Sequence, residues 1–335
     1  MNSDCKFYIA EYIPATAPYN EVCVHGKFYQ IWKISDRHAE RIDRSMINLN
    51  DKPHITFKEG FHDRWDDIEE FTNLPRRSFY ELEHQPGQYF PRMARPVLKN
   101  YGFNPLDHFP SDTFCPSDID DINNLAIMRS QLNVLLSELD NICQYVHPDK
   151  GSMDKVYGNK IRNLLIISCT EVESCWKGVL KKNFYNENEK RKNKNLIVND
   201  YRKLCAPMRL NEYKISFPKY PWIGDFAPFT NWSADHENKV LNWYSDYNKT
   251  KHDREKHFSG ASLENAFLST SALFIMLIAQ YGITEVILED TNISSMVHIT
   301  EFPKWDQHQY YCPILLSNPQ SSEERTEWSE KHYFE

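Results

Sequence analysis

The sequence predicts a mainly α-helical protein, organised around an antiparallel helical bundle over residues 116–282. Two long stretches repeat apolar residues at three- and four-residue steps, which is the spacing of one buried helical stripe. A third stretch is apolar around most of its circumference, which indicates a buried helix. Residues 1–115 combine β-favouring runs with many prolines, and residues 283–335 again contain short strand patterns. We therefore expect an N-terminal α+β region, the bundle, and a C-terminal strand-bearing extension that ends in a polar tail.

Two short strand patterns stand out in the N-terminal region. Glu21–Ile34 has β-favouring residues on both sides of His25-Gly26, which predicts a hairpin. His54–Phe57 is a second candidate strand. The histidines of this region, including His62 and His84, have carboxylate neighbours that follow no metal-ligand spacing, so we expect no metal site.

The first two bundle helices carry the clearest periodicity. Ser117 is an N-cap residue with an acid three positions later, and Pro148 ends the first helix. A second helix is predicted from about Asp154 to Lys182. Glu173 borders its buried stripe, either as a surface glutamate or as the partner of a basic residue on a neighbouring helix. The two stripes are Ile122, Leu125, Leu132, Leu135, Leu139, Ile142 and Val146, and Ile161, Leu165, Cys169, Val172, Trp176 and Val179.

The chain then leaves the helical pattern. Lys181–Asn195 is polar and basic, which predicts an exposed loop that RNA could contact electrostatically. A short helix is expected over Leu196–Cys205. Residues 206–233 contain four prolines and repeated aromatics, so we expect a non-helical insertion packed on the bundle surface.

Two further helices close the bundle. The fourth is expected over about Asp235–His257, and the fifth over Ala261–Tyr281. The apolar surface of the fifth helix makes it either the central helix of the bundle or a dimer face. The extension that follows has strand candidates at Val297–Phe302 and Gln309–Leu316.

Composition limits the function classes. The chain has 335 residues, a net charge of −8 and a pI near 5.9, so any nucleic-acid site must be a local basic patch. Eight cysteines without a CxxC pair favour reduced thiols in a cytoplasmic protein over a disulfide frame or a zinc site. The first residues lack a signal-peptide pattern, and the apolar run Ala272–Ala279 is too short to span a bilayer. We expect a cytoplasmic protein without membrane association, metal or other cofactor.

A compact polar cluster lies in the stretch Leu241–Arg254. Helical spacing puts Asn248, Lys251 and His252 at i, i+3 and i+4, so their side chains can touch. Arg254 lies at the edge of the same patch. Such a surface can hold an anion, for example a phosphate. The alternative interpretation is a solvated basic helix end that complements the helix dipole.

The segment YNxxKHxR at Tyr247–Arg254, which leads into an apolar helix, resembles the HEPN family. The resemblance extends over the helices of Ser117–Tyr281, about half of the chain. HEPN domains are compact four- or five-helix bundles that often form homodimers. Many are metal-independent ribonucleases of prokaryotic toxin–antitoxin and phage-defence systems. Their motif has an arginine, a polar residue and then a histidine, and two motifs meet across the dimer.

Carried over by position, His252 matches the motif histidine and Asn248 the polar residue. Tyr247 occupies the arginine position, so Lys251 or Arg254 would have to supply the positive charge. The resemblance implies that His252 carries a proton during attack of the ribose 2′-OH on the adjacent phosphate, while these cations stabilise the phosphorane. The remaining residues of the predicted site, as substrate contacts, are Tyr244, Tyr247 and Lys249.

Three hypotheses remain open at this point. The first is a HEPN-like ribonuclease of a defence or toxin–antitoxin system, with RNA as substrate and an antitoxin as protein partner. The second is a catalytically inactive HEPN-like module that binds RNA, a nucleotide or a protein. The third is an unrelated helical protein. The first two imply a homodimer.

Overall fold

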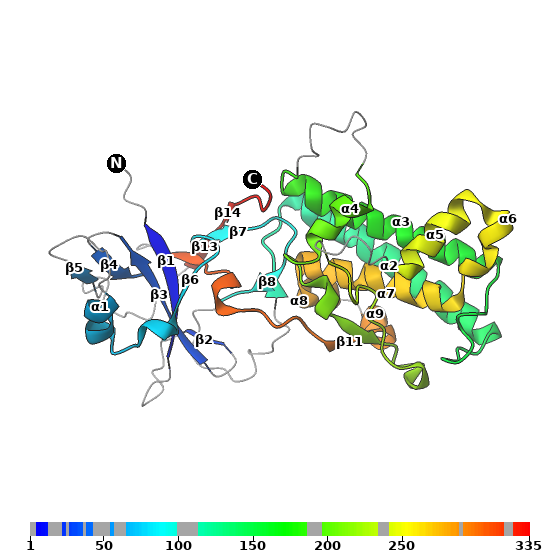
Figure 1. The fold of residues 1–335 in the computed structure, drawn as a ribbon, viewed down its shortest axis with the longest axis horizontal. Helices are drawn as coiled ribbons and strands as arrows, with labels where there is room; N and C mark the ends of the chain where they lie inside the picture. The colour runs from blue at the N-terminus through cyan, green and yellow to red at the C-terminus, as the bar shows by residue number, and fades with distance from the viewer. Residues whose placement is uncertain are drawn as a thin grey trace. The chain divides into compact units, whose positions relative to one another are not determined.

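The computed structural model describes residues 5–12, 22–24, 27–35, 38–42, 54–56, 65–98, 113–185, 196–233, 241–287, 291–317 and 324–335. The chain is mainly helical, with a small N-terminal sheet and short strands, as predicted (Figure 1). It divides into two compact units. The sheet unit comprises Met1–Tyr89, Arg95–Asp112 and Trp305–Lys331, and the helical unit comprises Phe90–Ala94, Thr113–Lys304 and His332–Glu335. The predicted C-terminal extension, 283–335, is therefore divided between the two units.

The sheet unit is built on antiparallel strands in the order β5-β4-β3-β1-β6, with β2 paired to β3. The predicted hairpin is confirmed as β2 and β3, and its turn residues His25 and Gly26 lie outside the described residues. The strand predicted at His54 is confirmed as β5. The elements of this unit are β1 Lys6–Tyr12, β2 Val22–Val24, β3 Lys27–Ile34, β4 His38–Arg41, β5 His54–Thr56, α1 Trp65–Thr72, η1 Arg76–Ser78, β6 Phe79–Glu81, β7 Gln88–Tyr89, β8 Arg95–Pro96, η6 Gln307–Gln309, β12 Ile314–Ser317, β13 Glu324–Glu327 and β14 Ser329–Glu330.

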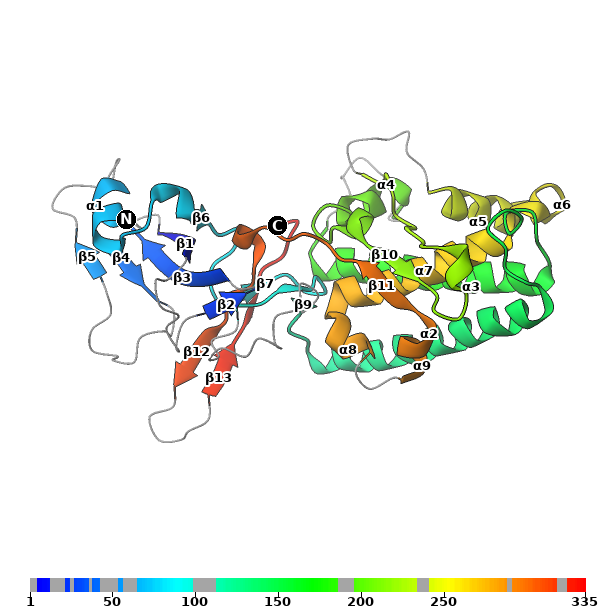
Figure 2. The ribbon, with the colours of Figure 1, turned by 90° about the horizontal axis from the view of Figure 1, so that it is seen from below.

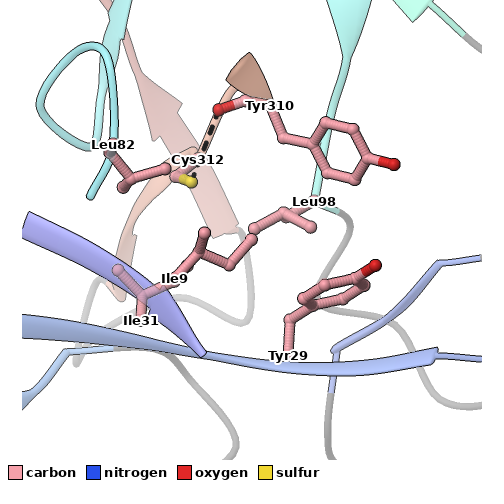
Figure 3. Packing of buried hydrophobic residues seen from close by; sticks show 7 residues of the cluster. All are labelled: Ile9, Tyr29, Ile31, Leu82, Leu98, Tyr310 and Cys312. Carbon is pink, nitrogen blue, oxygen red and sulfur yellow. Dashed lines mark hydrogen bonds between the residues drawn. The ribbon is translucent and has the colours of Figure 1, made fainter. Parts of the chain in front are cut away.

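Both faces of this sheet are covered, because successive strand residues point to opposite sides. On one face, Tyr8 and Trp32 pack with Ile68 of α1. On the other face, Ile9 and Ile31 pack with residues that return late in the chain (Figure 3). The cluster drawn there consists of Ile9, Tyr29, Ile31, Leu82, Leu98, Tyr310 and Cys312. The end of the chain is therefore part of the fold and not a simple polar tail: β12 pairs with β13, and β14 pairs in parallel with β7.

The helical unit contains the predicted helices. Its elements are β9 Thr113–Phe114, α2 Ile119–Tyr145, α3 Asn159–Lys182, α4 Val198–Tyr201, η2 Arg202–Leu204, η3 Leu210–Glu212, β10 Lys214–Ser216, η4 Pro221–Ile223, α5 Asn242–His252, α6 Arg254–His257, η5 Phe258–Gly260, α7 Leu263–Tyr281, α8 Ile283–Ile287, α9 Thr291–Met296 and β11 His298–Glu301. The N-cap of α2 is Asp118, one residue after the predicted Ser117, and its carboxylate accepts from the Asp121 N–H at 2.7 Å. The second stripe is buried as predicted, whereas Ile122 of the first stripe is exposed.

Helix α7 is the central helix of this unit. It contacts α2, α3 and α5, and 17 of its 19 residues are buried. Its length and composition would also allow it to cross a membrane, but 89% of that apolar window is covered by the chain itself. The interpretation of this helix as the central helix of the bundle is therefore confirmed. Its apolar surface is covered and is not available as a dimer face.

The non-helical insertion contributes to the core and does not only lie on its surface. Its strand β10 pairs with β11, which confirms the strand predicted at Val297–Phe302. Phe217 and Phe226 pack against Phe267 of α7 at ring-centroid distances of 4.8 and 5.3 Å. The predicted loop at Lys181–Asn195 lies mostly outside the described residues, as does the start of the predicted fourth helix.

Gly282 gives a direct test of how α7 ends. Its φ of +94° is a conformation that L side chains rarely adopt, and an added Cβ would overlap the carbonyl oxygen of Thr113. We expect Gly282→Ala to lower the free energy of unfolding by about 3 kcal/mol, measured by urea denaturation followed by circular dichroism.

The matched control is Gly158→Ala, at the N-cap of α3. Its φ is −179°, and no atom lies within 4 Å of an added Cβ. This variant should lower the free energy of unfolding by at most about 1 kcal/mol, because glycine is preferred over alanine at an N-cap. Equal losses in the two variants would contradict the described end of α7.

Candidate functional site

Helix α5 is held in the unit by its aromatic face. Trp243, Tyr244 and Tyr247 are all buried. The indole N–H of Trp243 donates to the Pro228 carbonyl at 2.9 Å, which ties the helix to the insertion. The rings leave only the opposite face of α5 for charged groups. The aromatic and the charged residues of this segment are neighbours in the sequence, but the helix places the aromatic ones in a buried set and the charged ones in an exposed set.

Tyr244 makes a polar contact with α3 inside this packed face. Its hydroxyl donates to a carboxylate oxygen of Glu173 at 2.8 Å, and Lys177 lies 3.5 Å from the other oxygen. Burial raises the pKa of Tyr244, and the neighbouring Glu173 carboxylate raises it further. Glu173 thus binds a residue of a neighbouring helix, but this residue is a tyrosine and not the basic residue considered from the sequence.

Tyr247, at the motif arginine position, is fully buried. Its hydroxyl accepts a hydrogen bond from the Lys251 ammonium at 2.8 Å, and the same cation lies 5.0 Å from the ring centroid. The hydrogen bond to Tyr247 raises the pKa of Lys251, so the lysine stays charged at neutral pH. Tyr244 and Tyr247 pack beneath the exposed residues of α5, and because both are buried they are not accessible to a ligand.

The exposed set lies where α5 ends. Asp253 leaves the helical conformation, with φ −140° and ψ 78°, and its carboxylate caps α6 by accepting from the Lys256 N–H. Arg254 then donates to the side-chain oxygen of Asn159 at 3.0 Å, and its guanidinium lies 5.2 Å from the Phe258 ring. Asn159 begins α3, so Arg254 is held by residues distant in the sequence. No local sequence pattern indicates this contact.

The remaining residues of the predicted site differ in whether their polar groups are free to bind a ligand. Asn248 donates its amide to the Tyr244 carbonyl of its own helix at 3.0 Å, so this group is already occupied. Lys249 pairs with Asp246 at 3.1 Å on the surface. His252 is exposed and makes no hydrogen bond to the described part of the chain.

The resulting surface favours an anionic ligand. Within the described residues, Lys251 and Arg254 form no salt bridge, although the Glu173 carboxylate lies near enough to Lys251 to help raise its pKa, and His252 lies between them in the sequence. A phosphate accepts hydrogen bonds from lysine, arginine and imidazole side chains alike, so an anion with several phosphates could contact each of these groups. Among the described residues, no group of three or more His, Cys, Asp or Glu side chains is arranged to hold a metal ion. His84 is buried in the sheet unit, where burial, and then the charge of Arg95, lower its pKa to about 3.

The comparisons with known proteins add no family. No protein-family model matches the sequence, and no curated protein or solved structure matches the chain. The function must therefore be argued from the chemistry of the site.

The burial of Tyr247 leads to a prediction about the motif. Tyr247→Arg puts arginine at its position in the HEPN motif, but it would place a guanidinium in the aromatic core without a carboxylate partner. We expect a loss of about 3 kcal/mol in the free energy of unfolding and no gain of ribonuclease activity. Urea denaturation and an RNA cleavage assay measure the two effects.

Lys249→Arg is the matched control, because it introduces arginine two residues later on the exposed face. It should leave the stability within about 0.5 kcal/mol of the natural chain. A stable Tyr247→Arg protein that cleaves RNA would contradict the buried placement of Tyr247.

Proposed function

We propose that the helical unit is a HEPN-like module that binds RNA without cleaving it, in the cytoplasm of a prokaryotic cell. The observation that carries the proposal is the pair of cations at the end of α5. Lys251 is oriented by a tyrosine hydroxyl and Arg254 by an asparagine oxygen, and neither forms a salt bridge within the described residues. Cations held in this way suit the phosphates of an RNA backbone, which dominate the affinity of nucleic-acid binding. The seven described cysteines are free thiols, in keeping with a reducing compartment.

Three features favour binding over cleavage. The motif arginine is replaced by Tyr247, which is buried. Asn248 uses its amide within its own helix and does not orient His252. Loss of one well-placed donor to the developing charge typically costs about 10²–10³ in rate, so a site without its arginine is a poor catalyst.

A second candidate, a metal-independent ribonuclease, is favoured by one observation. His252 is exposed at the end of α5, where a second copy of the chain could approach it. In that case a homodimer through the α5–α6 surface would bring the two copies of His252 to one shared basic surface. An antitoxin-type protein would then cover the same surface.

Binding should depend on the two cations and on salt. In fluorescence anisotropy with a labelled single-stranded RNA, we expect Lys251→Gln and Arg254→Gln each to weaken binding about threefold to tenfold. Each should also reduce the slope of log K against log salt by about 0.7, because one phosphate contact is lost. Glutamine removes the charge and keeps an amide donor for Tyr247 or Asn159.

The control is Lys203→Gln, an exposed lysine of η2 that lies outside both α5–α6 and the basic loop Lys181–Asn195. It should leave affinity and salt slope unchanged, and equal effects at all three positions would contradict a localised site. The RNA should be recovered intact with and without EDTA. Products that end in a 2′,3′-cyclic phosphate, and that disappear in His252→Ala, would replace the binding module with the ribonuclease.

A further inference from the structure

An exposed tryptophan lies at the same end of the helical unit as the two cations. Trp222 belongs to η4 in the insertion and is 52% exposed. The His147 ring, from the segment after α2, stacks on it with a centroid distance of 5.3 Å and an interplanar angle of 11°. Both residues are on the surface, so this pair is not part of the hydrophobic core.

The indole is nevertheless held in place. Its N–H donates to the Pro148 carbonyl at 2.8 Å, and the next residue, Ile223, is buried. Tyr220, two residues earlier, packs edge-on against Trp222 at 5.8 Å and donates its hydroxyl to Asp140 at 2.7 Å. These contacts orient the ring but leave half of its surface in solvent. Packing in the hydrophobic core does not explain why the Trp222 ring is held in a fixed orientation while half of it is exposed.

The connection between α2 and α3 joins this pair to the cation site. It begins with His147, against Trp222, and at its other end Tyr157 packs edge-on on Phe258 at 5.6 Å. Asn159, which follows, accepts from Arg254. Both ribbon views show α6 at the end of the unit where α2 ends and α3 begins (Figures 1 and 2). The two surfaces are therefore built on one short segment of chain.

We propose that Trp222 and His147 form a stacking platform for an unpaired base of the RNA whose phosphates contact Lys251 and Arg254. This inference rests on the RNA-binding function proposed above. Aromatic side chains beside a basic groove are the usual means of binding single-stranded RNA, because every base has a face that can stack. Lys150 is exposed beside the platform, with its ammonium 3.2 Å from the position of a Cβ on Gly224.

Two other exposed aromatics extend the platform along the same connection. Tyr145 is 85% exposed at the end of α2, and Tyr157 is 50% exposed where α3 begins. In the chain, Tyr157 lies between His147, which stacks on Trp222, and Asn159, which binds Arg254. An extended strand of a few nucleotides could thus place bases on rings and phosphates on the cations. Double-stranded RNA keeps its bases stacked and could not use these rings.

The test compares two ligands of equal charge. One is a labelled ten-nucleotide single-stranded RNA, and the other is the same ribose-phosphate chain without bases. In anisotropy titrations with the full chain, we expect the intact RNA to bind about tenfold more tightly than the abasic chain. Trp222→Ala should remove most of this difference and leave the affinity for the abasic chain unchanged. Trp222→Phe, which keeps a smaller ring, should retain part of it.

Phe184→Ala is the matched control. Phe184 is 53% exposed and also packs against a histidine, His332, at 3.6 Å, but it lies at the opposite end of α3. It should leave both affinities unchanged. Circular dichroism checks that each variant folds, and the comparison of the two ligands on the natural chain needs no variant.

The outcomes separate the two proposals. Equal affinity for intact and abasic chains would overturn the platform and leave phosphate binding at α5–α6 intact. Failure to bind either ligand would overturn the RNA-binding function and the platform with it. An acidic peptide that binds as tightly as the RNA and is lost in Trp222→Ala would assign the platform to a protein partner, against our proposal.

Discussion

The packing around Trp176 is the constraint on which the functional end of the helical unit depends. This fully buried side chain of α3 contacts rings from three other parts of the unit, with centroid distances between 5.0 and 6.4 Å. Its ring partners are Tyr201, Phe229, Trp232, Trp243 and Tyr244. Aromatic pairs of this kind contribute about 0.5–1.5 kcal/mol each beyond the burial of their area. The insertion and α5 thus both pack against α3 at this residue.

This constraint decides which residues of α5 can meet a ligand. The side that faces Trp176 is committed to the core, and Tyr244 and Tyr247 are on it. Their hydroxyls still act on the site, since Tyr247 accepts from Lys251 and Tyr244 donates to Glu173. At the position that the HEPN resemblance assigns to arginine, this chain has a core tyrosine that supports a neighbouring lysine. On the function proposed above, a lysine held in this way suits the binding of an anion more than the stabilisation of a transition state.

The parts of the structure that could be predicted from the sequence are those with a local signal. Helix α7 and the stripe of α3 follow from a period of 3.6 residues, and the β2–β3 hairpin follows from two β-favouring runs around a short turn. The candidate site could not be predicted in this way, because it is formed by contacts between residues far apart in the chain. Arg254 meets Asn159 across 95 positions, and Trp222 meets His147 across a segment that includes all of α3. Periodicity does not indicate such pairs, and for the same reason the packing role of the insertion and the return of β14 to β7 could not be foreseen.

The connection between α2 and α3 is a rigid support for both surfaces. Its backbone is anchored to the start of α7, where Leu263 N–H donates to the Val156 carbonyl at 2.8 Å and Glu264 N–H donates to the Met153 carbonyl at 3.2 Å. Anchoring at these points holds the exposed side chains of the connection in place without burying them. A ligand that contacts such side chains loses less free energy to ordering them than it would on a free loop. An RNA strand that already contacts the cations would bind the rings in an intramolecular step, because both surfaces are carried by one rigid segment. Its affinity would therefore exceed that of either contact alone. On the function proposed above, modest individual contacts on this end of the unit would combine into binding of single-stranded RNA, even though the chain as a whole carries a net charge of −8.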